Sequence, residues 1–489
     1  DISSGNDWGS CMSTIGFTGG KYYYETTVTG SSYSYIGAAL ATNLPTDYPS
    51  KYKSWALLND GNCYYDQHGS NTLSVNTGTS VPAGAVVGVA IDADNGKIWW
   101  SINGTWIGSG SPNPATGSNP IFSNIPTDET LVACLDVYGN SASVNFGQRA
   151  FAYTPPTGFK ALSTENLPNP TIAKGSTAFD IVTRNGGGTT ETLGFGPAIV
   201  WAKRRELSSN HYIFDTVRGN DKYIAPNTNG AEGETTGSFT FNSDGFTVSS
   251  GFDWPSSASI VEWCWDAGTS TVSNTDGTIS ANVRANQSVG CSIVKATISG
   301  SGTIGHGLNA KPHMVFRKRT DGTGDWYVAV DTGSVEGYLL LNSAAAITSQ
   351  SVNLTTNTFD AAWLGNSGEE WINYAFAPVE GFSAFGTYTG NGSTDGPFVY
   401  TGFRPKFILQ KRTDGSASWN IVDTERSSFN VTGVTLYPDS ASAEGTIDLF
   451  DILSNGFKLR TTNGGQNASN GTFIYAAFAE HPLKISRAR

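Results

Sequence analysis

The chain has 489 residues and a formal charge of −12, with 29 Lys and Arg against 41 Asp and Glu. This acidic balance argues against a general binder of nucleic acid or of anionic membranes, because both need a basic face. Glycine is frequent, at 58 residues, and no long window repeats apolar residues at helical spacing. Short apolar runs between turn residues predict an all-β protein, and the length predicts several domains.

Residues 1–160 are predicted to form the first domain. A strand is expected at Gly19–Val28, with Ser32–Leu40 as its hairpin partner across a short turn. Two further turns are expected at Asp94–Gly96 and Asn103–Gly104, where side chains or glycine tolerate positive φ between alternating strands. The segment therefore reads as a compact β domain.

This stretch resembles the SPRY domain in the order and spacing of its motifs. The motifs are GKYYYE, IG, VVGVAIDADNGKIWWSINGTWIG, VNFGQRAF and TPPTGF, within about residues 10–160. The resemblance implies a bent two-sheet β-sandwich, with Trp99, Trp100 and Phe146 in or beside its core. SPRY domains bind partners through loops at one edge and have no catalytic centre. On this analogy the candidate binding-loop residues are Tyr64, Tyr65, Asp66, Gln67 and His68, with a core or turn role for the two tyrosines as the alternative.

A second pattern occurs three times further along the chain. Each copy has a proline, an apolar strand containing Lys-Arg, a turn, a second strand and an Asp-Thr pair, which predicts a β-hairpin. In the second copy the turn TDGTG is expected to use glycine for positive φ. The proline-to-aspartate distance is 18, 19 and 18 residues, from Pro197 to Asp215, Pro312 to Asp331 and Pro405 to Asp423. Such repetition predicts a tandem array, and favours display or binding over catalysis.

The repeats set the predicted domain boundaries. Each copy also has a strand before the hairpin, a strand marked by phenylalanine and an aromatic exit strand, which predicts a β-sandwich or jelly-roll. The second and third copies adjoin without a linker, so we expect them to pack rigidly together. The boundaries are a linker at 161–176, repeats at 177–268, 291–380 and 381–480, a second linker at 269–290 and a C-terminal tail at 481–489.

Recurring charged residues raise the question of an ion site. A carboxylate at the end of a strand can ligate calcium, or it can accept N–H bonds from the turn that follows. The recurring aspartates are Asp215, Asp331 and Asp423. No second acidic residue recurs at a fixed distance, which favours the turn cap and predicts no metal. Lysines also recur in the first hairpin strand, at Lys203, Lys318 and Lys411; structural pairing is predicted for them, with a sugar or anion contact as the alternative.

No catalytic constellation is found. Glu369 and Glu370 are adjacent, but neighbours on a strand point to opposite faces, and no nucleophile, zinc or phosphate-loop motif occurs. We therefore expect no enzyme activity and no cofactor. The five cysteines have no metal-ligand spacing and are predicted to be reduced and buried. Three aromatic residues lie in polar loops, where an exposed ring would stack on a sugar or anchor a partner: Trp254, Trp363 and Tyr437.

The module order resembles that of virion proteins of tailed bacteriophages, with a SPRY domain joined to Gly/Ser/Thr-rich β-repeats through TPPTGFKALSTENLPNPTI. This resemblance implies a non-enzymatic tail-fibre or receptor-binding subunit that adheres to a host surface glycan or protein. It implies a homo-oligomer, with a trimer favoured, held to other virion proteins by a segment that precedes Asp1. We expect assembly in the bacterial cytoplasm and display on the particle, on the tail rather than the capsid, without nucleic-acid binding or membrane insertion. A capsid decoration or other structural virion protein is the alternative, and a glycan-degrading tailspike fits less well.

Overall fold

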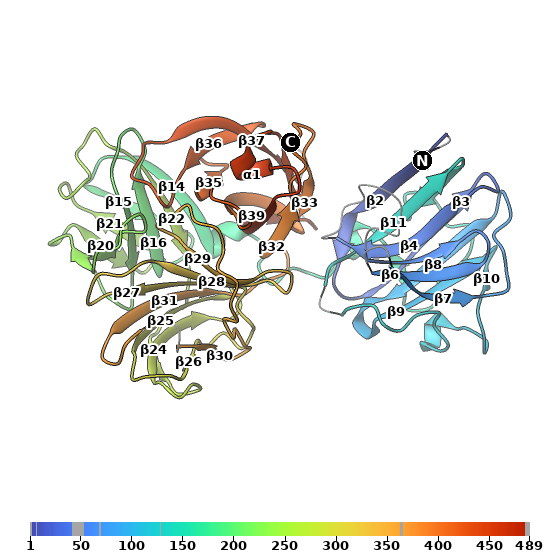
Figure 1. Cartoon of the computed structure of the whole chain (residues 1–489), viewed down its shortest axis with the longest axis horizontal. Helices are drawn as coiled ribbons and strands as arrows, with labels where there is room; N and C mark the ends of the chain where they lie inside the picture. Colours follow the sequence, from blue (N-terminus) through green and yellow to red (C-terminus); the bar gives the residue numbers. More distant parts are fainter. Residues whose placement is uncertain are drawn as a thin grey trace. The chain divides into compact units, whose positions relative to one another are not determined.

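The computed structural model describes residues 2–5, 7–41, 53–67, 70–127, 129–361 and 365–484. The protein is all-β, as predicted, and its described part contains one short α-helix, α1 (Gly464–Asn467). The chain divides into two compact units, Asp1–Asn169 and Pro170–Arg489, which are coloured blue to cyan and green to red in Figure 1. The boundary between them falls inside the predicted linker at 161–176.

The first unit consists of two antiparallel sheets. The first sheet has the order β1 (Ile2–Ser3), β12 (Ser141–Asn145), β3 (Lys21–Val28), β8 (Val86–Asp92), β9 (Lys97–Ile102) and β10 (Thr105–Trp106), and β13 (Lys160–Ala161) pairs in parallel with β3. The second sheet has the order β2 (Trp8–Phe17), β11 (Leu131–Tyr138), β4 (Ser34–Leu40), β5 (Ser54–Leu58), β6 (Asn62–Gln67) and β7 (Ser70–Asn76). Buried Tyr24 and Trp100 of the first sheet join the two, by donating hydrogen bonds of 2.5 and 2.8 Å to the carbonyls of Gly37 and Ile36.

The predicted hairpin between Gly19–Val28 and Ser32–Leu40 is wrong, because β3 and β4 belong to different sheets. The side chain of Asn140 holds the crossing between them, since its Nδ2 donates to the Ser32 carbonyl at 3.0 Å. A Cβ at Gly30 would lie 2.6 Å from Asn140 Oδ1, so the crossing needs glycine. The two other predicted turns are confirmed, with positive φ at Gly96, Asn103 and Gly104. Both Trp99 and Trp100 are fully buried and Phe146 is half-buried, as the resemblance implied.

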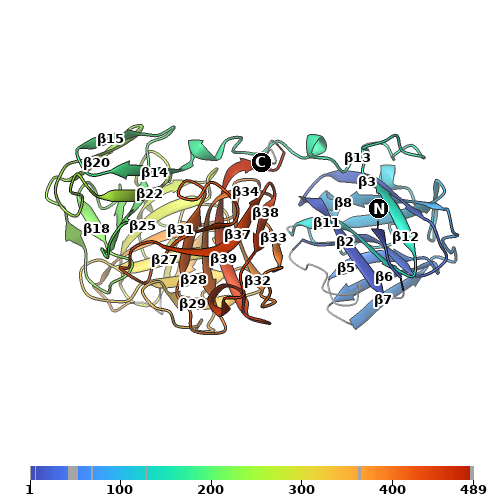
Figure 2. The ribbon, with the colours of Figure 1, turned by 90° about the horizontal axis from the view of Figure 1, so that it is seen from above.

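The second unit contains three related sheets, one for each repeat, and many of their strands are labelled in Figures 1 and 2. Each sheet places the exit strand between the entry strand of its repeat and the first strand of the hairpin. In repeat 1 the order is β14 (Phe179–Asn185), β22 (Ser259–Trp265), β16 (Ile199–Arg204), β17 (His211–Asp215), β18 (Lys222–Ile224) and β19 (Gly233–Glu234). In repeat 2 it is β25 (Cys291–Thr297), β31 (Glu370–Phe376), β27 (Met314–Arg319), β28 (Tyr327–Asp331) and β29 (Glu336–Leu340). In repeat 3 it is β32 (Ser383–Thr389), β39 (Thr472–Pro482), β34 (Phe403–Arg412), β35 (Asn420–Asp423), β36 (Thr432–Leu436), β37 (Gly445–Leu453), β38 (Gly456–Leu459) and β33 (Phe398–Tyr400).

Small additional strands complete repeats 1 and 2. Repeat 1 has a second sheet of β15 (Thr189–Thr192), β21 (Gly245–Val248) and β20 (Phe239–Asn242), and repeat 2 has a pair of β26 (Thr303–Gly305) and β30 (Thr358–Asp360). The predicted linker at 269–290 is wrong, because it contains β23 (Val272–Asn274) and β24 (Ala281–Asn286), which extend the sheet of repeat 2. Two alternate residues of β24, Ala281 and Val283, have buried side chains. This largely polar stretch therefore has the period of two that is typical of a strand with one buried face.

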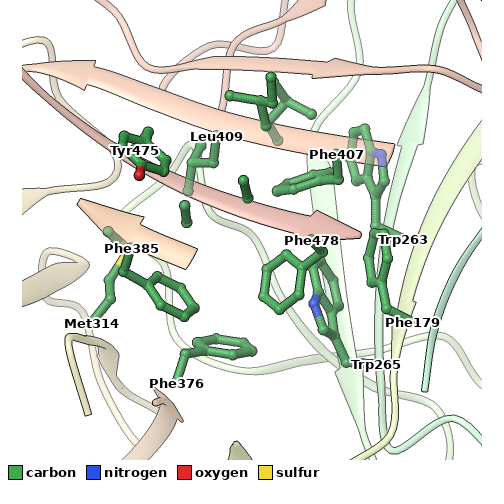
Figure 3. Close-up of a cluster of buried hydrophobic side chains, with 14 of the residues drawn as sticks. Phe179, Trp263, Trp265, Met314, Phe376, Phe385, Phe407, Leu409, Tyr475 and Phe478 are labelled. Carbon is green, nitrogen blue, oxygen red and sulfur yellow. The ribbon is translucent and has the colours of Figure 1, made fainter. Parts of the chain in front are cut away.

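The three repeats share one hydrophobic core, shown in Figure 3. Its centre is a triangle of rings at the same register position of the three exit strands: Trp265 opposite Ile199, Phe376 opposite Met314 and Phe478 opposite Phe407. The ring centroids are 5.7 Å (Trp265–Phe478), 5.8 Å (Phe376–Phe478) and 6.1 Å (Trp265–Phe376) apart. The repeats are therefore packed around a common centre, and repeats 1 and 2 each also enclose a core of their own between their two sheets. An apolar cavity of about 30 Å³ beside these rings is far below the ~300 Å³ of a ligand pocket.

The three predicted hairpins are confirmed as β16–β17, β27–β28 and β34–β35. The expected reason for glycine in the TDGTG turn of the second copy is wrong, because neither Gly322 nor Gly324 has positive φ; Gly415 in the third copy does not have it either. In both turns the arginine three residues earlier folds over the glycine: an added Cβ would lie 2.7 Å from the guanidinium of Arg319 and 2.9 Å from that of Arg412. Each arginine also pairs with the turn aspartate.

Candidate functional site

The predicted binding-loop residues of the first unit belong to a strand. Tyr64, Tyr65, Asp66 and Gln67 lie in β6, which pairs with β5 and β7, so their placement in a loop is wrong. His68 and the side chains of Asp66 and Gln67 lie outside the described residues. The two tyrosines point to opposite faces of the strand: Tyr65 stacks on buried Trp55 with ring centroids 5.2 Å apart, whereas Tyr64 joins a surface cluster.

That cluster is the candidate functional site, and we call it the aromatic platform: Trp8, Tyr33, Tyr35, Tyr64 and Tyr138. It is built across the second sheet of the first unit, where β2, β11 and β4 are hydrogen-bonded neighbours. Trp8 and Tyr138 are direct cross-strand partners. Tyr33 is 55% exposed and the other four rings are half-buried, so the platform is a partly exposed aromatic surface on a hydrogen-bonded sheet.

Trp8 is the centre of the aromatic platform. Its ring centroid lies 5.4 Å from that of Tyr138, 5.7 Å from Tyr35 and 6.4 Å from Tyr33. Tyr35 continues the cluster to Tyr64, with centroids 6.0 Å apart. These are ordinary distances for aromatic pairs that stabilise each other.

Polar side chains border the aromatic platform at Tyr64. Exposed Asp60 accepts hydrogen bonds of 2.8 Å from both the backbone N–H and the side-chain amide of Asn62. Partial burial, together with the Asp60 carboxylate, raises the pKa of the Tyr64 hydroxyl. Like any tyrosine hydroxyl, it can both donate and accept. The edge of the platform thus offers an acceptor, an amide and a hydroxyl next to aromatic rings.

The two predicted loop aromatics that the structure describes, Trp254 and Tyr437, do not form a second such surface. Trp254 is fully buried in the repeat 1 core and is wrong as an exposed binding ring; its neighbour Phe252, at φ +50° and 39% exposed, lies over it instead. Tyr437 is half-buried, and its carbonyl accepts a hydrogen bond from His211. Trp363 lies outside the described residues.

The repeated aspartates differ in role. All three cap a turn, as predicted, by accepting an N–H bond from the residues that follow. Asp215 and Asp423 are also buried and form ion pairs with Arg218 and Arg426, three residues on. In the described ranges, no three His, Cys, Asp or Glu side chains gather as a metal site.

Asp331 is displaced by one residue relative to its counterparts. Asp215 and Asp423 lie opposite Ile199 and Phe407, whereas the matching position in repeat 2, opposite Met314, is taken by Val330. Asp331 therefore points to the opposite face of the strand from its counterparts. There it forms an ion pair of 2.6 Å with Lys311, which is more exposed than Asp331. The additional residue in the 19-residue spacing of repeat 2 explains this shift.

The buried aspartates also join different repeats. Tyr374 of repeat 2 donates its hydroxyl proton to Asp215 of repeat 1 at 2.7 Å. Trp263 of repeat 1 donates its indole N–H to Asp423 of repeat 3 at 3.0 Å. Trp263 and Tyr374 occupy equivalent positions of their exit strands, and the equivalent residue of repeat 3 is Ala476, opposite Leu409. In the third interface Val330 takes the place of the aspartate and Ala476 that of the aromatic donor, so no polar partner is needed.

Each hairpin docks on the repeat before it in a closed cycle. Trp326 of repeat 2 donates to the Ala225 carbonyl of repeat 1, and Trp419 of repeat 3 donates to the Leu340 carbonyl of repeat 2, both at 2.9 Å. In repeat 1 this place belongs to His211, 3.1 Å from the Tyr437 carbonyl of repeat 3. Two backbone hydrogen bonds accompany each docking: Ser209 to Ala441 and Glu444 to Arg205, Gly324 to Asn229 and Glu232 to Thr320, and Ala417 to Ala344 and Ile347 to Thr413. The second unit is therefore a closed ring of three repeats.

The repeated lysines stabilise the hairpin ends. Lys203, Lys318 and Lys411 are fully buried, and each donates to the carbonyl of the arginine that follows, at 2.5, 2.9 and 2.6 Å. Burial lowers the pKa of each of them to about 8. Their contacts are those of the framework. The adjacent Glu369 and Glu370 form separate ion pairs, with Arg319 and Lys295.

His211 makes one interface of the ring sensitive to acid. Its Nδ1 accepts the indole N–H of Trp201 at 3.0 Å, so the neutral ring carries its proton on Nε2 and donates it to Tyr437. Burial lowers the pKa of His211 well below its usual value. Between the folded and unfolded pKa values the unfolded chain binds more protons, so stability falls as the pH drops below ~6.5, by up to ~1.4 kcal/mol per pH unit.

We expect His211→Gln, which keeps one donor and one acceptor, to make the fall in stability below pH 6.5 less steep. The measurement is the urea unfolding free energy of the second unit at several pH values from 7 to 5. His481→Gln is the matched control, because His481 is half-buried near the end of β39. An unchanged slope in His211→Gln would contradict the assignment.

Two family models match this chain, one within each compact unit. The chain belongs to the family described as "Domain of unknown function (DUF7483)", which matches residues 174–482 and so covers the ring of three repeats. Residues 21–149 match the SPRY domain, which confirms the resemblance seen in the sequence. Among solved structures, the SPRY domain of human HERC1 is similar, with 16% sequence identity, a TM-score of 0.23, and coverage of 30% of this chain and 87% of that chain.

Sequence reasoning missed most of the aromatic platform. Of its five members only Tyr64 was a candidate. The alternation of Tyr33 and Tyr35 in SYSYI was an available signal, because residues two apart share a face of a strand.

No helix in the described part of the chain is long and apolar enough to cross a membrane.

Proposed function

We propose that the chain is a non-enzymatic adhesion protein, a receptor-binding subunit of tail-fibre type on the surface of a bacteriophage particle. The SPRY domain contacts the host surface through the aromatic platform, and the ring of three repeats is the framework that carries it. The observation that supports adhesion most directly is the accessible ring cluster centred on Trp8. The phage context is proposed on the resemblance of the module order and the linking sequence to those of tailed-phage virion proteins.

The repeats support a framework role because their recurring charged residues form ion pairs and hydrogen bonds within the protein. The buried aspartates bind arginines and turn N–H groups, and the buried lysines bind carbonyls. A single adhesion site of this size binds weakly, so we propose that several copies act together as a homo-oligomer and gain avidity, with a trimer favoured.

Electron microscopy of phage particles that carry this chain tests the proposal. Gold-labelled antibody against the full chain is expected on the tail, and labelled full chain is expected to bind host cells. Antibody on the head would overturn the tail assignment in favour of a capsid decoration. Release of reducing sugar from host polysaccharide by the full chain would overturn the non-enzymatic assignment in favour of a tailspike.

A further inference from the structure

We infer that the aromatic platform binds a neutral, turned or branched oligosaccharide by stacking its rings on the apolar faces of the sugars. This inference rests on the proposed function and names the ligand class of the same site. The tilt of the rings, the polar groups at their edge and the size of the surface support it.

The ring planes exclude a flat polymer. The plane of Trp8 is tilted by 35° to Tyr33, 42° to Tyr35 and 46° to Tyr138, and Tyr35 is tilted by 61° to Tyr64. A flat, extended polysaccharide surface needs coplanar rings to stack on several sugars at once. A turned or branched oligosaccharide presents sugar faces in different directions, which matches this surface.

The edge of the platform matches sugar hydroxyl groups. A sugar hydroxyl both donates and accepts; the exposed carboxylate of Asp60 can accept from it, and the Tyr64 hydroxyl can donate to it. The same carboxylate, on a chain with a formal charge of −12, repels an anionic sugar. The charge of the site therefore selects neutral glycans.

The size of the surface favours a sugar over a protein partner. A stable protein interface takes ~20–30 residues on each side, whereas the platform has five rings, four of them half-buried. An oligosaccharide of a few units needs only a few rings. The experiment below also distinguishes a protein ligand from a glycan.

Glycan-array binding of the labelled full chain tests the inference, with neutral oligosaccharides compared with uronic-acid and sialylated ones. We expect binding to neutral members, and a loss of at least about tenfold in affinity for Trp8→Ala and for Tyr33→Ala. Tyr33 is 55% exposed, so its removal leaves the fold intact and keeps the test valid if Trp8→Ala unfolds the domain. Phe429→Ala, at an 85% exposed ring of the second unit, is the matched control and should bind as wild type.

Several outcomes would overturn the inference. One is binding only to anionic glycans, and another is wild-type affinity in both platform variants. Periodate and protease treatment of host cells separates this inference from the proposed function. If cell binding survives periodate and is lost after protease, adhesion stands and the glycan assignment falls. If the chain binds no host cells and decorates the head of the particle, the proposed function itself falls.

Discussion

Asp215→Ala is expected to lower the free energy of unfolding of the second unit by about 3–5 kcal/mol. The substitution leaves the guanidinium of Arg218 buried without its carboxylate, and removing one partner of a buried ion pair has an effect of this size. It also removes the acceptor for Tyr374 of repeat 2, at 2.7 Å, and for two turn N–H groups. The measurement is urea or guanidinium unfolding of the full chain, followed by tryptophan fluorescence.

Asp331→Ala is the matched control for this experiment. Asp331 has the same sequence context, but it pairs at the surface with Lys311, and exposed pairs contribute only ~0–1 kcal/mol. A difference of several kcal/mol between the two variants is the expected result. Equal losses would show that the one-residue displacement in repeat 2 does not exist, and with it the distinction between buried and surface aspartates would fall.

Phe478→Ala is expected to destabilise the second unit by about 3–5 kcal/mol, as is typical for truncation of a buried aromatic ring. Phe478 is 3% exposed and contacts Trp265 of repeat 1 and Phe376 of repeat 2 at the common centre. The loss is therefore felt by all three repeats. In differential scanning calorimetry the second unit should unfold in one transition, and this whole transition should move to lower temperature.

The exposed ring of Phe429, in the same repeat, provides the comparison for Phe478. Phe429→Ala should change the unfolding free energy by less than ~0.5 kcal/mol. Separate unfolding transitions for the repeats, with only the last of them displaced by Phe478→Ala, would contradict the shared core. They would show that each repeat unfolds as a separate β-sandwich.

Much of the fold was predictable because local signals decide it. The hairpins follow from apolar strands around short turns, and the SPRY domain follows from motifs at regular positions. How the repeats pack was not predictable, since ring contacts such as Trp265–Phe478 join residues far apart in the chain. The only sign of the displacement of Asp331 in the sequence was the spacing of 19 residues, against 18 in the other two repeats. This spacing could not show which face of the strand the aspartate would occupy.

The site was less predictable than the fold, because an aromatic residue looks the same in sequence whether its ring is buried or exposed. Trp254 stands among polar letters but lies in the core of repeat 1. Tyr64 and Tyr65 are adjacent, yet one joins the aromatic platform and the other packs on Trp55. Trp8 and Tyr138 meet only because β2 pairs with β11 across more than a hundred residues.

Covalent linkage gives the ring of three repeats a freedom that three identical subunits do not have. In a symmetric homotrimer every interface must be the same, because one gene copy encodes all three. Here two interfaces bury Asp–Arg pairs joined to an aromatic donor, and the third has Val330 and Ala476. Each interface can therefore change on its own, by mutations that need to be compatible with only one partner. Such a ring can diverge one interface at a time while its common centre stays intact.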